Sequence, residues 1–489
     1  MKSRYLLTAL AALAAVAPPA PAETEAQYYA ALVDGKKVGH AVMSRTATKQ
    51  EVTHQVESLL EIRRAGQVAK MRQRETTVET PDGKPLRFSS DQDLGIMSMK
   101  VEGTVAKGMM TLKITSAGQT KTVTRNWPKG ALLPEGLALL TRKMGLKEGT
   151  TYAARMFEPS LLQVLEAKAH VGPKKKADLL GRVVELTEIK TTTTVPTVGM
   201  TITSYSYVND EYDALKTVIP VAGMKVEMIA CSRAFALSKN DPADFLEKML
   251  VAAPAALKDL PGAESVTYHL SPKGKAELKV PALDGQAVRA GKAGTVLVTV
   301  RRVAAPQGVA MPYKGTDKAA RAALEPNRFL QSDRKEVIAL ARKAAGDAKD
   351  AARAAKRIRD FVHTYVHKKD FSIGYASAVE VAKSREGDCS EHAVLAAALC
   401  RAVGIPAEMV IGVVYVPLKD RAPVFGAHAW YRVFLDGKWV QMDAALPDGW
   451  GLGHLALATG SGNIDDFFQL LGTLGQFSIT QAEVEKKKP

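Results

Sequence analysis

Residues 27 to about 238 alternate between hydrophobic and polar positions in short runs, the pattern of half-buried β-strands. The first two runs, 28–33 and 38–43, flank Asp34-Gly35, a dipeptide typical of tight hairpin turns. One helix is predicted near 136–144. Further strands are predicted at 56–62, 74–79, 97–105, 110–114, 122–126, 182–189, 201–208 and 216–229. We expect one large, curved antiparallel sheet or half-barrel, which could hold a ligand or serve only as a scaffold.

Between this region and the last third of the chain, the hydrophobic and polar positions follow a mixture of helix, loop and strand patterns. Residues 241–260 read as helix and loop, and three short strands are predicted between 264 and 303. The stretch 304–321 holds Pro306, Pro312 and two glycines, which is typical of a loop. We interpret residues 246–325 as a small β module and linker.

After residue 325 the hydrophobic period changes to that of helices. Four segments begin with a capping residue followed three positions later by Glu or Asp, which marks helix starts: Asp333 with Glu336, Asp347 with Asp350, Ser377 with Glu380, and Asp388 with Glu391. The fourth helix is expected to run from Cys389 to Val403 and to end at Gly404. Strands are then predicted at 407–416, 427–434 and 439–442.

Helices followed by an antiparallel meander define an α+β domain over residues 326–489. The fold class predicted for the whole chain is therefore multidomain. A mostly antiparallel β domain over 23–245 precedes the small module at 246–325 and the C-terminal α+β domain.

The first 22 residues have the pattern of an export signal. Lys2 and Arg4 precede an apolar run at 5–16, and Ala20-Pro21-Ala22 supplies small residues for cleavage. The apolar run is shorter than the roughly 20 residues that span a bilayer. We expect a periplasmic or secreted protein that does not span a membrane after signal removal. An uncleaved N-terminal anchor is the alternative.

The chain is strongly basic. Its formal net charge is +16, and loss of Lys2 and Arg4 with the signal leaves +14. This charge favours anionic partners such as cell-envelope polymers, lipid head groups or acidic proteins. The basic runs at Lys174–Lys176 and Lys486–Lys488 are short and contain no aromatic residues, so we expect no nucleic acid partner.

The three cysteines are Cys231, Cys389 and Cys400, an odd number that leaves at least one free thiol. Cys389 and Cys400 are eleven residues apart on one predicted helix, about 16 Å along its axis. A disulfide needs Cα atoms within about 7 Å, so these two cannot pair. With Asp388 as the N-cap, Cys389 is the first helical residue, where the helix dipole favours a thiolate. A purely structural cysteine is the alternative.

A predicted hairpin brings an imidazole and a carboxylate together. Pairing outward from the Asp436-Gly437 turn places Trp430 opposite Asp443, and His428 diagonal to Asp443 on the same face. Diagonal neighbours are about 7–8 Å apart at Cα, within reach for these two side chains. The other face is apolar and is expected to belong to the core. A thiol, an imidazole and a carboxylate in this order form the set that activates a cysteine nucleophile. A chance pair on a solvated hairpin is the alternative.

Four segments, 387–393, 401–407, 428–430 and 439–443, together resemble the transglutaminase-like superfamily. The resemblance covers about residues 330–460. It implies a papain-like α+β core in which Cys389 is the nucleophile, His428 the acid and base, and Asp443 the residue that orients the ring. Ala444-Ala445 departs from the threonine or proline that many relatives carry there, which leaves the three residues intact.

The function predicted from these residues is that of an exported cysteine-dependent acyl enzyme. It would act on peptide or glutamine-type amide bonds of a protein or peptide substrate through a thioester, with hydrolysis favoured over cross-linking. The Cys389 backbone N–H is one expected oxyanion donor. Tyr375 is a candidate for the second, and Trp430 is expected to wall the acyl site. The sequence predicts no metal and no cofactor.

The alternative is a catalytically inert scaffold. In that case the large β domain would bind a lipid, polymer or protein of the cell envelope.

Overall fold

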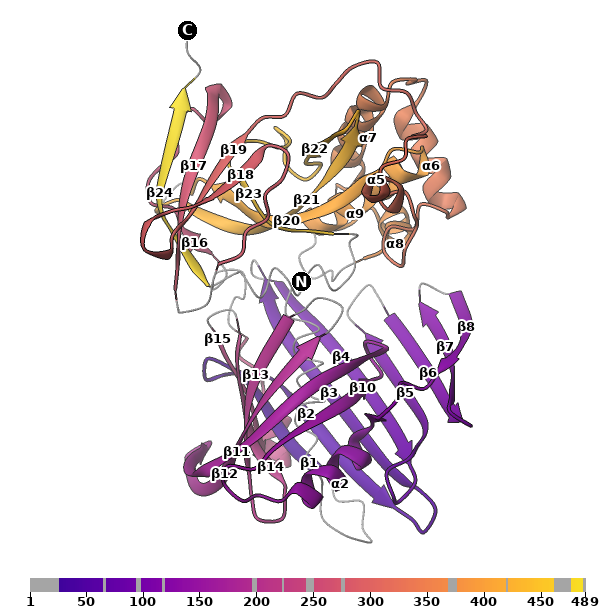
Figure 1. Ribbon diagram of the computed structural model, residues 1–489, viewed down its shortest axis with the longest axis vertical. Coiled ribbons are helices and arrows are strands. Elements are labelled where there is room, and N and C mark those ends of the chain that lie inside the picture. The colour runs from indigo at the N-terminus through magenta and orange to yellow at the C-terminus, as the bar shows by residue number, and fades with distance from the viewer. Residues whose placement is uncertain are drawn as a thin grey trace. The chain divides into compact units, whose positions relative to one another are not determined.

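The computed structural model describes residues 26–64, 67–93, 98–116, 119–195, 200–221, 224–242, 250–273, 278–367, 376–418, 421–460 and 476–486. The chain forms two compact units, residues 1–245 and 246–489 (Figure 1). The predicted fold class is confirmed: the first unit is built mainly from antiparallel strands, and the second is α+β. Within the described residues, no helix is both long and apolar enough to cross a membrane.

The first unit contains a 15-stranded sheet among its described residues. The predicted first hairpin is confirmed, because β1 (Gln27–Val33) pairs with β2 (Lys36–Ala47) across Asp34-Gly35. β1 also pairs with β15 (Met224–Cys231), so the chain's first strand lies in the middle of the sheet. On one side of this junction the sheet continues through β3 (Val52–Arg64), β4 (Gln67–Glu79), β5 (Pro85–Asp93), β6 (Ser98–Ala106), β7 (Met109–Ser116) and β8 (Gln119–Asn126).

The other half of the sheet leads away from β15 in reverse chain order. It consists of β14 (Ala214–Val221), β13 (Met200–Val208), β12 (Arg182–Val195), β11 (Gln163–Leu179), β10 (Thr151–Glu158) and β9 (Ala131–Leu132). The single long strand predicted at 216–229 is in fact two strands, β14 and β15, which pair with each other. The predicted helix is α2 (Pro134–Met144), and a short helix, α3 (Arg233–Ala236), follows β15.

This sheet rolls up so that strands distant in its order face one another (Figure 1). Phe88 on β5 and Phe157 on β10 have ring centroids only 5.1 Å apart. The carboxylate of Glu79 on β4 accepts hydrogen bonds from the first backbone N–H groups of α2, at 2.6 Å from Glu135 and 2.9 Å from Gly136. Buried contacts of this kind join distant parts of the sheet, which is curved as predicted.

The second unit has two smaller sheets and five described helices. One sheet has the order β18-β19-β17-β24, and in the other β21 pairs with β16, β20 and β22 while β23 flanks β20. Their strands are β16 (Val251–Ala252), β17 (Ala263–Pro272), β18 (Gln286–Ala290), β19 (Val296–Arg301), β20 (Ala407–Val416), β21 (Val424–Leu435), β22 (Lys438–Met442), β23 (His454–Gly460) and β24 (Phe477–Lys486). The helices are α5 (Lys318–Ala322), α6 (Lys335–Ala345), α7 (Ala351–Tyr365), α8 (Ala378–Ser384) and α9 (Cys389–Ala402). Two single 3₁₀ turns lie at Leu260–Gly262 and Lys292–Gly294.

Two of the four predicted helix caps are confirmed. Ser377 and Asp388 each form a complete capping box at the start of α8 and α9. α6 begins after Arg334 rather than Asp333, without a side-chain cap. The cap of α7 is Asp350, not Asp347, because Asp350 also accepts a hydrogen bond from the backbone of Val309 and so fixes where the helix begins.

Helix α9 is the centre of the second unit's core. Its residues from Ser390 to Arg401 are all buried. It packs against β20 and β21, and α6, α7 and α8 also contact it. Small side chains make this close packing possible, since five of its fourteen residues are alanine. The helix therefore delivers its first residue, Cys389, to a fixed position beside the sheet.

Candidate active site

Cys389 is the first residue of α9, as predicted, and its side chain is partly exposed. Asp388 caps the helix through its Oδ1, which accepts hydrogen bonds from the backbone N–H of Ser390 at 2.9 Å and the Ser390 hydroxyl at 2.6 Å. The carboxyl of Glu391 closes the capping box by accepting from the Asp388 N–H at 2.9 Å. The N-terminus of a helix carries a partial positive charge, which favours negative charge on a side chain at this position.

The turn before Cys389 depends on Gly387. Its φ is +152°, a backbone conformation that side chains disfavour, and a Cβ added there would lie 2.2 Å from Cβ of Glu391. Glycine is therefore required for the close approach that completes the capping box. This local geometry sets where the thiol lies.

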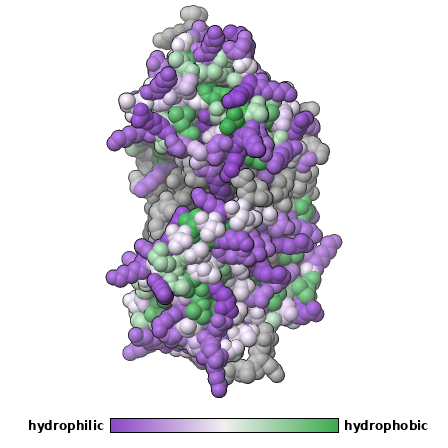
Figure 2. Space-filling model, turned by 90° about the vertical axis from the view of Figure 1, so that its right-hand side faces the viewer, coloured by the Kyte–Doolittle hydropathy of each residue, from purple (hydrophilic) through white to green (hydrophobic). Residues whose placement is uncertain are grey.

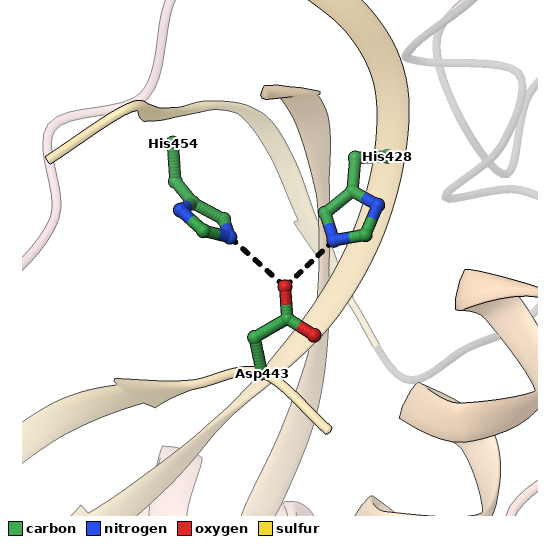
Figure 3. A group of neighbouring side chains, drawn as sticks. All are labelled: His428, Asp443 and His454. Carbon is green, nitrogen blue, oxygen red and sulfur yellow. Dashed lines mark hydrogen bonds and ion pairs between the residues drawn. The ribbon is translucent and has the colours of Figure 1, made fainter. Parts of the chain in front are cut away.

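The predicted hairpin register is confirmed. Tyr431 pairs with Met442 and Leu435 with Lys438, and Asp443 follows directly after the last paired residue of β22. The Nε2 of buried His428 donates to the Oδ2 of buried Asp443 at 2.7 Å (Figure 3). Cys389 lies beside the same imidazole, close enough for its charge to act on the ring. The structure thus brings the three predicted residues together, with Asp443 on the Nε2 of His428 and Cys389 beside the ring.

The charges around His428 favour its protonated form. Burial lowers the pKa of this imidazole, but the negative charges of Asp443 and of the Cys389 thiolate outweigh it and raise the pKa to about 10. Burial alone would raise the pKa of Asp443, yet the positive His428 and the hydrogen bonds from both histidines hold it below its usual range. His428 and Asp443 therefore stabilise each other as a buried ion pair, with Cys389 beside them.

A fourth residue, His454, completes this arrangement and was not anticipated from the sequence. It is the first residue of β23, and its Nε2 donates to the same Asp443 Oδ2 at 2.9 Å (Figure 3). Its Nδ1 lies 3.1 Å from the backbone nitrogen and 3.0 Å from the carbonyl oxygen of Gly451, which hold the ring in place. Burial lowers the pKa of His454, so the ring is neutral beside the charged pair. The run His454-Leu-Ala-Leu-Ala458 was the available signal, since recognising it as a strand next to β20 would have placed the histidine here.

Residues 338–444 match the family model described as the transglutaminase-like superfamily. The second unit carries a transglutaminase-like domain. The matched segment includes Cys389, His428 and Asp443 and ends ten residues before His454. The match supports a cysteine-type enzyme in broad terms.

Two further comparisons bear on the chain. No curated protein matches it. A solved structure described as a candidate cysteine protease from Cytophaga hutchinsonii is similar with a TM-score of 0.29 and 20% identity, over 46% of this chain and 88% of that one.

Trp430 does not line an open acyl site in the transglutaminase-like domain. Its side chain has 0% exposed surface, and its indole N–H donates to Gln441 Oε1 at 2.8 Å. Its ring stacks on His428 with centroids 5.9 Å apart, and its edge meets His454 at 5.1 Å. His428, Ala429, Trp430 and Tyr431 are all buried, so both faces of β21 are covered here. Trp430 fixes the orientation of the two histidines.

Other residues of the domain complete the site or fall outside the described chain. His392, three residues after Cys389, is buried, and its Nδ1 donates to the Asp388 carbonyl at 2.7 Å. Burial lowers its pKa, so this ring is neutral and acts as part of the support for the helix start. Tyr375, the predicted second oxyanion donor, lies outside the described residues.

The transglutaminase-like domain offers one possible set of metal ligands among its described residues. One ligand atom each of His428, Asp443 and His454 lie within 4.8 Å of one another. Imidazole and carboxylate are zinc ligands. A metal there would take the same Nε2 atoms that now donate to Asp443 at 2.7 and 2.9 Å. Metal binding would therefore break the chain that orients His428, and so would oppose rather than assist the chemistry of the thiol.

Proposed function

We propose that this protein is an exported cysteine-dependent acyl enzyme that cleaves peptide or glutamine-type amide bonds through a thioester on Cys389. The observation that carries this proposal is that Cys389 and the Asp443 carboxylate meet at the imidazole of His428. A nucleophile, a base and an orienting carboxylate in this order are the arrangement of covalent acyl transfer.

The first half of the proposed reaction forms the thioester. His428 holds the proton of the Cys389 thiol, and the thiolate attacks the carbonyl carbon of the amide. Negative charge develops on the carbonyl oxygen, where the backbone N–H of Cys389 and the start of α9 stabilise it. The C–N bond then breaks, and His428 gives its proton to the leaving ammonia or amine.

The second half regenerates the thiol. A water molecule gives a proton to His428 as its oxygen attacks the thioester carbonyl, the C–S bond breaks, and the returned proton restores the Cys389–His428 pair. A carboxylic acid leaves. If a lysine amine attacks in place of water, the product is a cross-link. We propose hydrolysis as the main outcome and transglutamination as the minor one.

Asp443 and His454 act on this reaction through His428. Asp443 keeps the Nε2 of His428 protonated, so the nitrogen at the thiol is the one that exchanges protons. His454 donates to the same carboxylate oxygen and so holds Asp443 in place. Mutation of a residue that orients a reacting group in this way commonly lowers activity by about 10–100-fold.

Export to the periplasm or beyond is part of the proposal, supported by the pattern of residues 1–22. The +14 charge left after signal removal supports anionic envelope components as partners. Hydrophilic side chains cover most of the face drawn in Figure 2, with hydrophobic residues in small groups between them. A water-exposed protein is consistent with that surface.

Selective alkylation tests the proposed nucleophile. At about pH 6 an ordinary thiol is almost fully protonated, whereas an ion-paired thiolate reacts. We expect iodoacetamide to modify Cys389 well before Cys231 or Cys400 and expect His428→Ala to abolish the preference, as read by peptide mass spectrometry. Buried Cys400 and half-buried Cys231 are internal controls. Equal, slow labelling of Cys389 and Cys231 would contradict the proposal.

A second candidate function is that of a binding scaffold, favoured by one feature of the first unit. A surface pocket of about 400 Å³ lies over β2 to β5, a size typical of small-molecule sites. It is lined mainly by charged side chains, including Glu57, Arg72, Arg74, Asp91 and Asp93. Under this alternative, Cys389→Ala leaves the biological activity of the protein unchanged.

A further inference from the structure

The interior of the first unit contains a buried polar layer in place of a continuous apolar core. On β4, Gln73 and Glu75 point inward, and on the neighbouring β5, Ser90 and Gln92 do the same. Glu158, at the end of β10, reaches them from the far side of the rolled sheet. Apolar side chains such as Met71 and Phe88 are buried on the same strands.

The members of this layer lie against one another. Gln73 pairs directly with Gln92 in the β4–β5 register, and Glu75 pairs with Ser90. The carboxyl groups of Glu75 and Glu158 lie close enough for the charge of Glu158 to act on Glu75. On the Glu158 side, the Ser160 hydroxyl donates to the carboxylate at 2.6 Å, and the Gln92 amide N–H donates to the Ser160 carbonyl at 3.4 Å. Two ends of one sheet therefore meet in a single polar cluster.

Four oxygen atoms of this cluster have no hydrogen-bond partner among the described residues: Gln73 Oε1, Glu75 Oε2, Ser90 Oγ and Gln92 Oε1. Ser90 and Gln92 are completely buried. Three of the four atoms are carbonyl or carboxylate oxygens, which in their ionised or amide form accept but do not donate. A buried acceptor without a partner is rare and costs about 1–3 kcal/mol. The layer therefore lacks a positive partner or a donor.

No basic side chain of the described residues supplies this positive partner. In the part of the chain that the structure describes, no Lys, Arg or His side chain forms an ion pair with Glu75 or Glu158. Burial and the neighbouring carboxyl raise the pKa of Glu75 well above its usual range, and burial raises that of Glu158. A proton shared by the pair would satisfy one oxygen of each carboxyl and leave the amide and hydroxyl oxygens unsatisfied.

We propose that this layer is a binding site for a divalent, oxygen-preferring cation of the calcium type. Its ligands are the carboxylates of Glu75 and Glu158, the amide oxygens of Gln73 and Gln92, and the Ser90 hydroxyl. Ca²⁺ takes about six to eight oxygens from carboxylates, amides and carbonyls in flexible geometry, and two carboxylates balance its charge. Mg²⁺ retains several waters and demands a tighter octahedron, so a dry layer disfavours it.

The bound cation would join β4 and β5 to the end of β10 across the interior. It would stabilise the rolled sheet of the first unit. The site is made only of residues of that unit, so it is independent of the thiol chemistry proposed for Cys389.

Calcium titration of the full-length mature chain tests this proposal. After treatment with a chelator, isothermal titration calorimetry with CaCl₂ up to about 1 mM, the range of extracellular calcium modules, is expected to show one site. Differential scanning calorimetry is expected to show that saturating Ca²⁺ raises the midpoint temperature of one unfolding transition by about 3 °C or more. MgCl₂ at the same concentration is the comparison and is expected to give a smaller rise.

Two variants and a matched control locate the site. Glu75→Gln is expected to abolish calcium binding, whereas Glu166→Gln, which changes an exposed glutamate on β11, leaves it intact. Ser90→Ala keeps both carboxylates, and we expect it to weaken binding by about tenfold in a protein that still folds, as checked by circular dichroism. No calcium binding by the wild type would overturn the proposal. So would stabilisation by calcium that persists in both Glu75→Gln and Ser90→Ala, since the ion would then bind elsewhere.

Discussion

Asp443 is the residue through which the site is organised. Its Oδ2 accepts from two imidazoles, His428 at 2.7 Å and His454 at 2.9 Å, while its Oδ1 accepts from the backbone N–H of Ala445 at 2.6 Å. A buried carboxylate with this many donors stays ionised and rigid. The departure at Ala444-Ala445 from the usual family residues costs nothing here, because the backbone of Ala445 supplies a donor.

His454 is predicted to matter for activity without touching the substrate. Replacing it with alanine leaves Asp443 one donor short, and we expect kcat to fall by about 10–100-fold with little change in KM. His454→Gln can return an N–H near the lost Nε2 and is expected to recover part of the activity. His269→Ala, which removes a partly exposed histidine paired with Glu483, is the control. Equal kcat values for His454→Ala and His269→Ala would contradict the assigned role.

The raised pKa of His428 has a consequence for stability. The imidazole pKa is about 6.5 in the unfolded chain and about 10 in the folded protein. The contribution of the His428 imidazole to the free energy of unfolding is therefore fully present below about pH 6.5. It is lost as the pH rises toward 10. Urea unfolding of wild type and His428→Ala should show a free-energy difference that shrinks across this window. The shrinkage should be smaller in a Cys389→Ala background, where the thiolate is absent. A pH-independent difference would contradict the ion-paired state.

The elements that sequence could predict are those fixed by local hydrogen bonding. The capping boxes at Ser377 and Asp388 involve four consecutive residues each, and the β21–β22 register follows from the two-residue turn at Asp436-Gly437. Three of the residues proposed for catalysis were found in this way. The start of α7 was missed because a contact with Val309, forty-one residues earlier, selects its cap.

Long-range pairing explains the other misses. β23 joins β20 across the 37 residues from 417 to 453, so no local rule placed His454 beside Asp443. The complete burial of Trp430 could not be predicted for the same reason, since the side chains that pack against its cluster, such as Leu283 and Trp450, come from distant segments. Alternation along one hairpin shows which residues share a face but not what packs against it.

Gly387 is predicted to be essential to the element that presents the thiol. In Gly387→Ala, the new Cβ must displace Glu391 and the backbone is strained, at a cost of about 1–3 kcal/mol for the strain alone. We expect lower stability in urea and a large loss of Cys389 alkylation at pH 6, because the capping box no longer closes. Gly262→Ala has open space and ordinary backbone geometry, so it serves as the control. Wild-type alkylation in Gly387→Ala would show that the cap does not position the thiol.

At the scale of the whole molecule, the chain carries two compact units with different kinds of interior. The core of the second is dense and apolar around α9. The first encloses the polar layer of Glu75 and Glu158, which alternation did not predict, because a polar residue in a strand usually faces water. Only the roll of the sheet brings these side chains inside. The strand predicted at 74–79 is therefore shorter than the observed β4, which extends over Gln67–Glu79.

The central claim is that Cys389 forms an acyl-enzyme. Mixing the full-length mature protein with excess p-nitrophenyl acetate should release a rapid burst of nitrophenol equal to one equivalent per chain, followed by slow turnover. Mass spectrometry of the quenched protein should find one acetyl group on Cys389, and His428→Ala should lose the burst. A steady release without a burst, or acetylation that persists in Cys389→Ala at the same rate, would contradict the account.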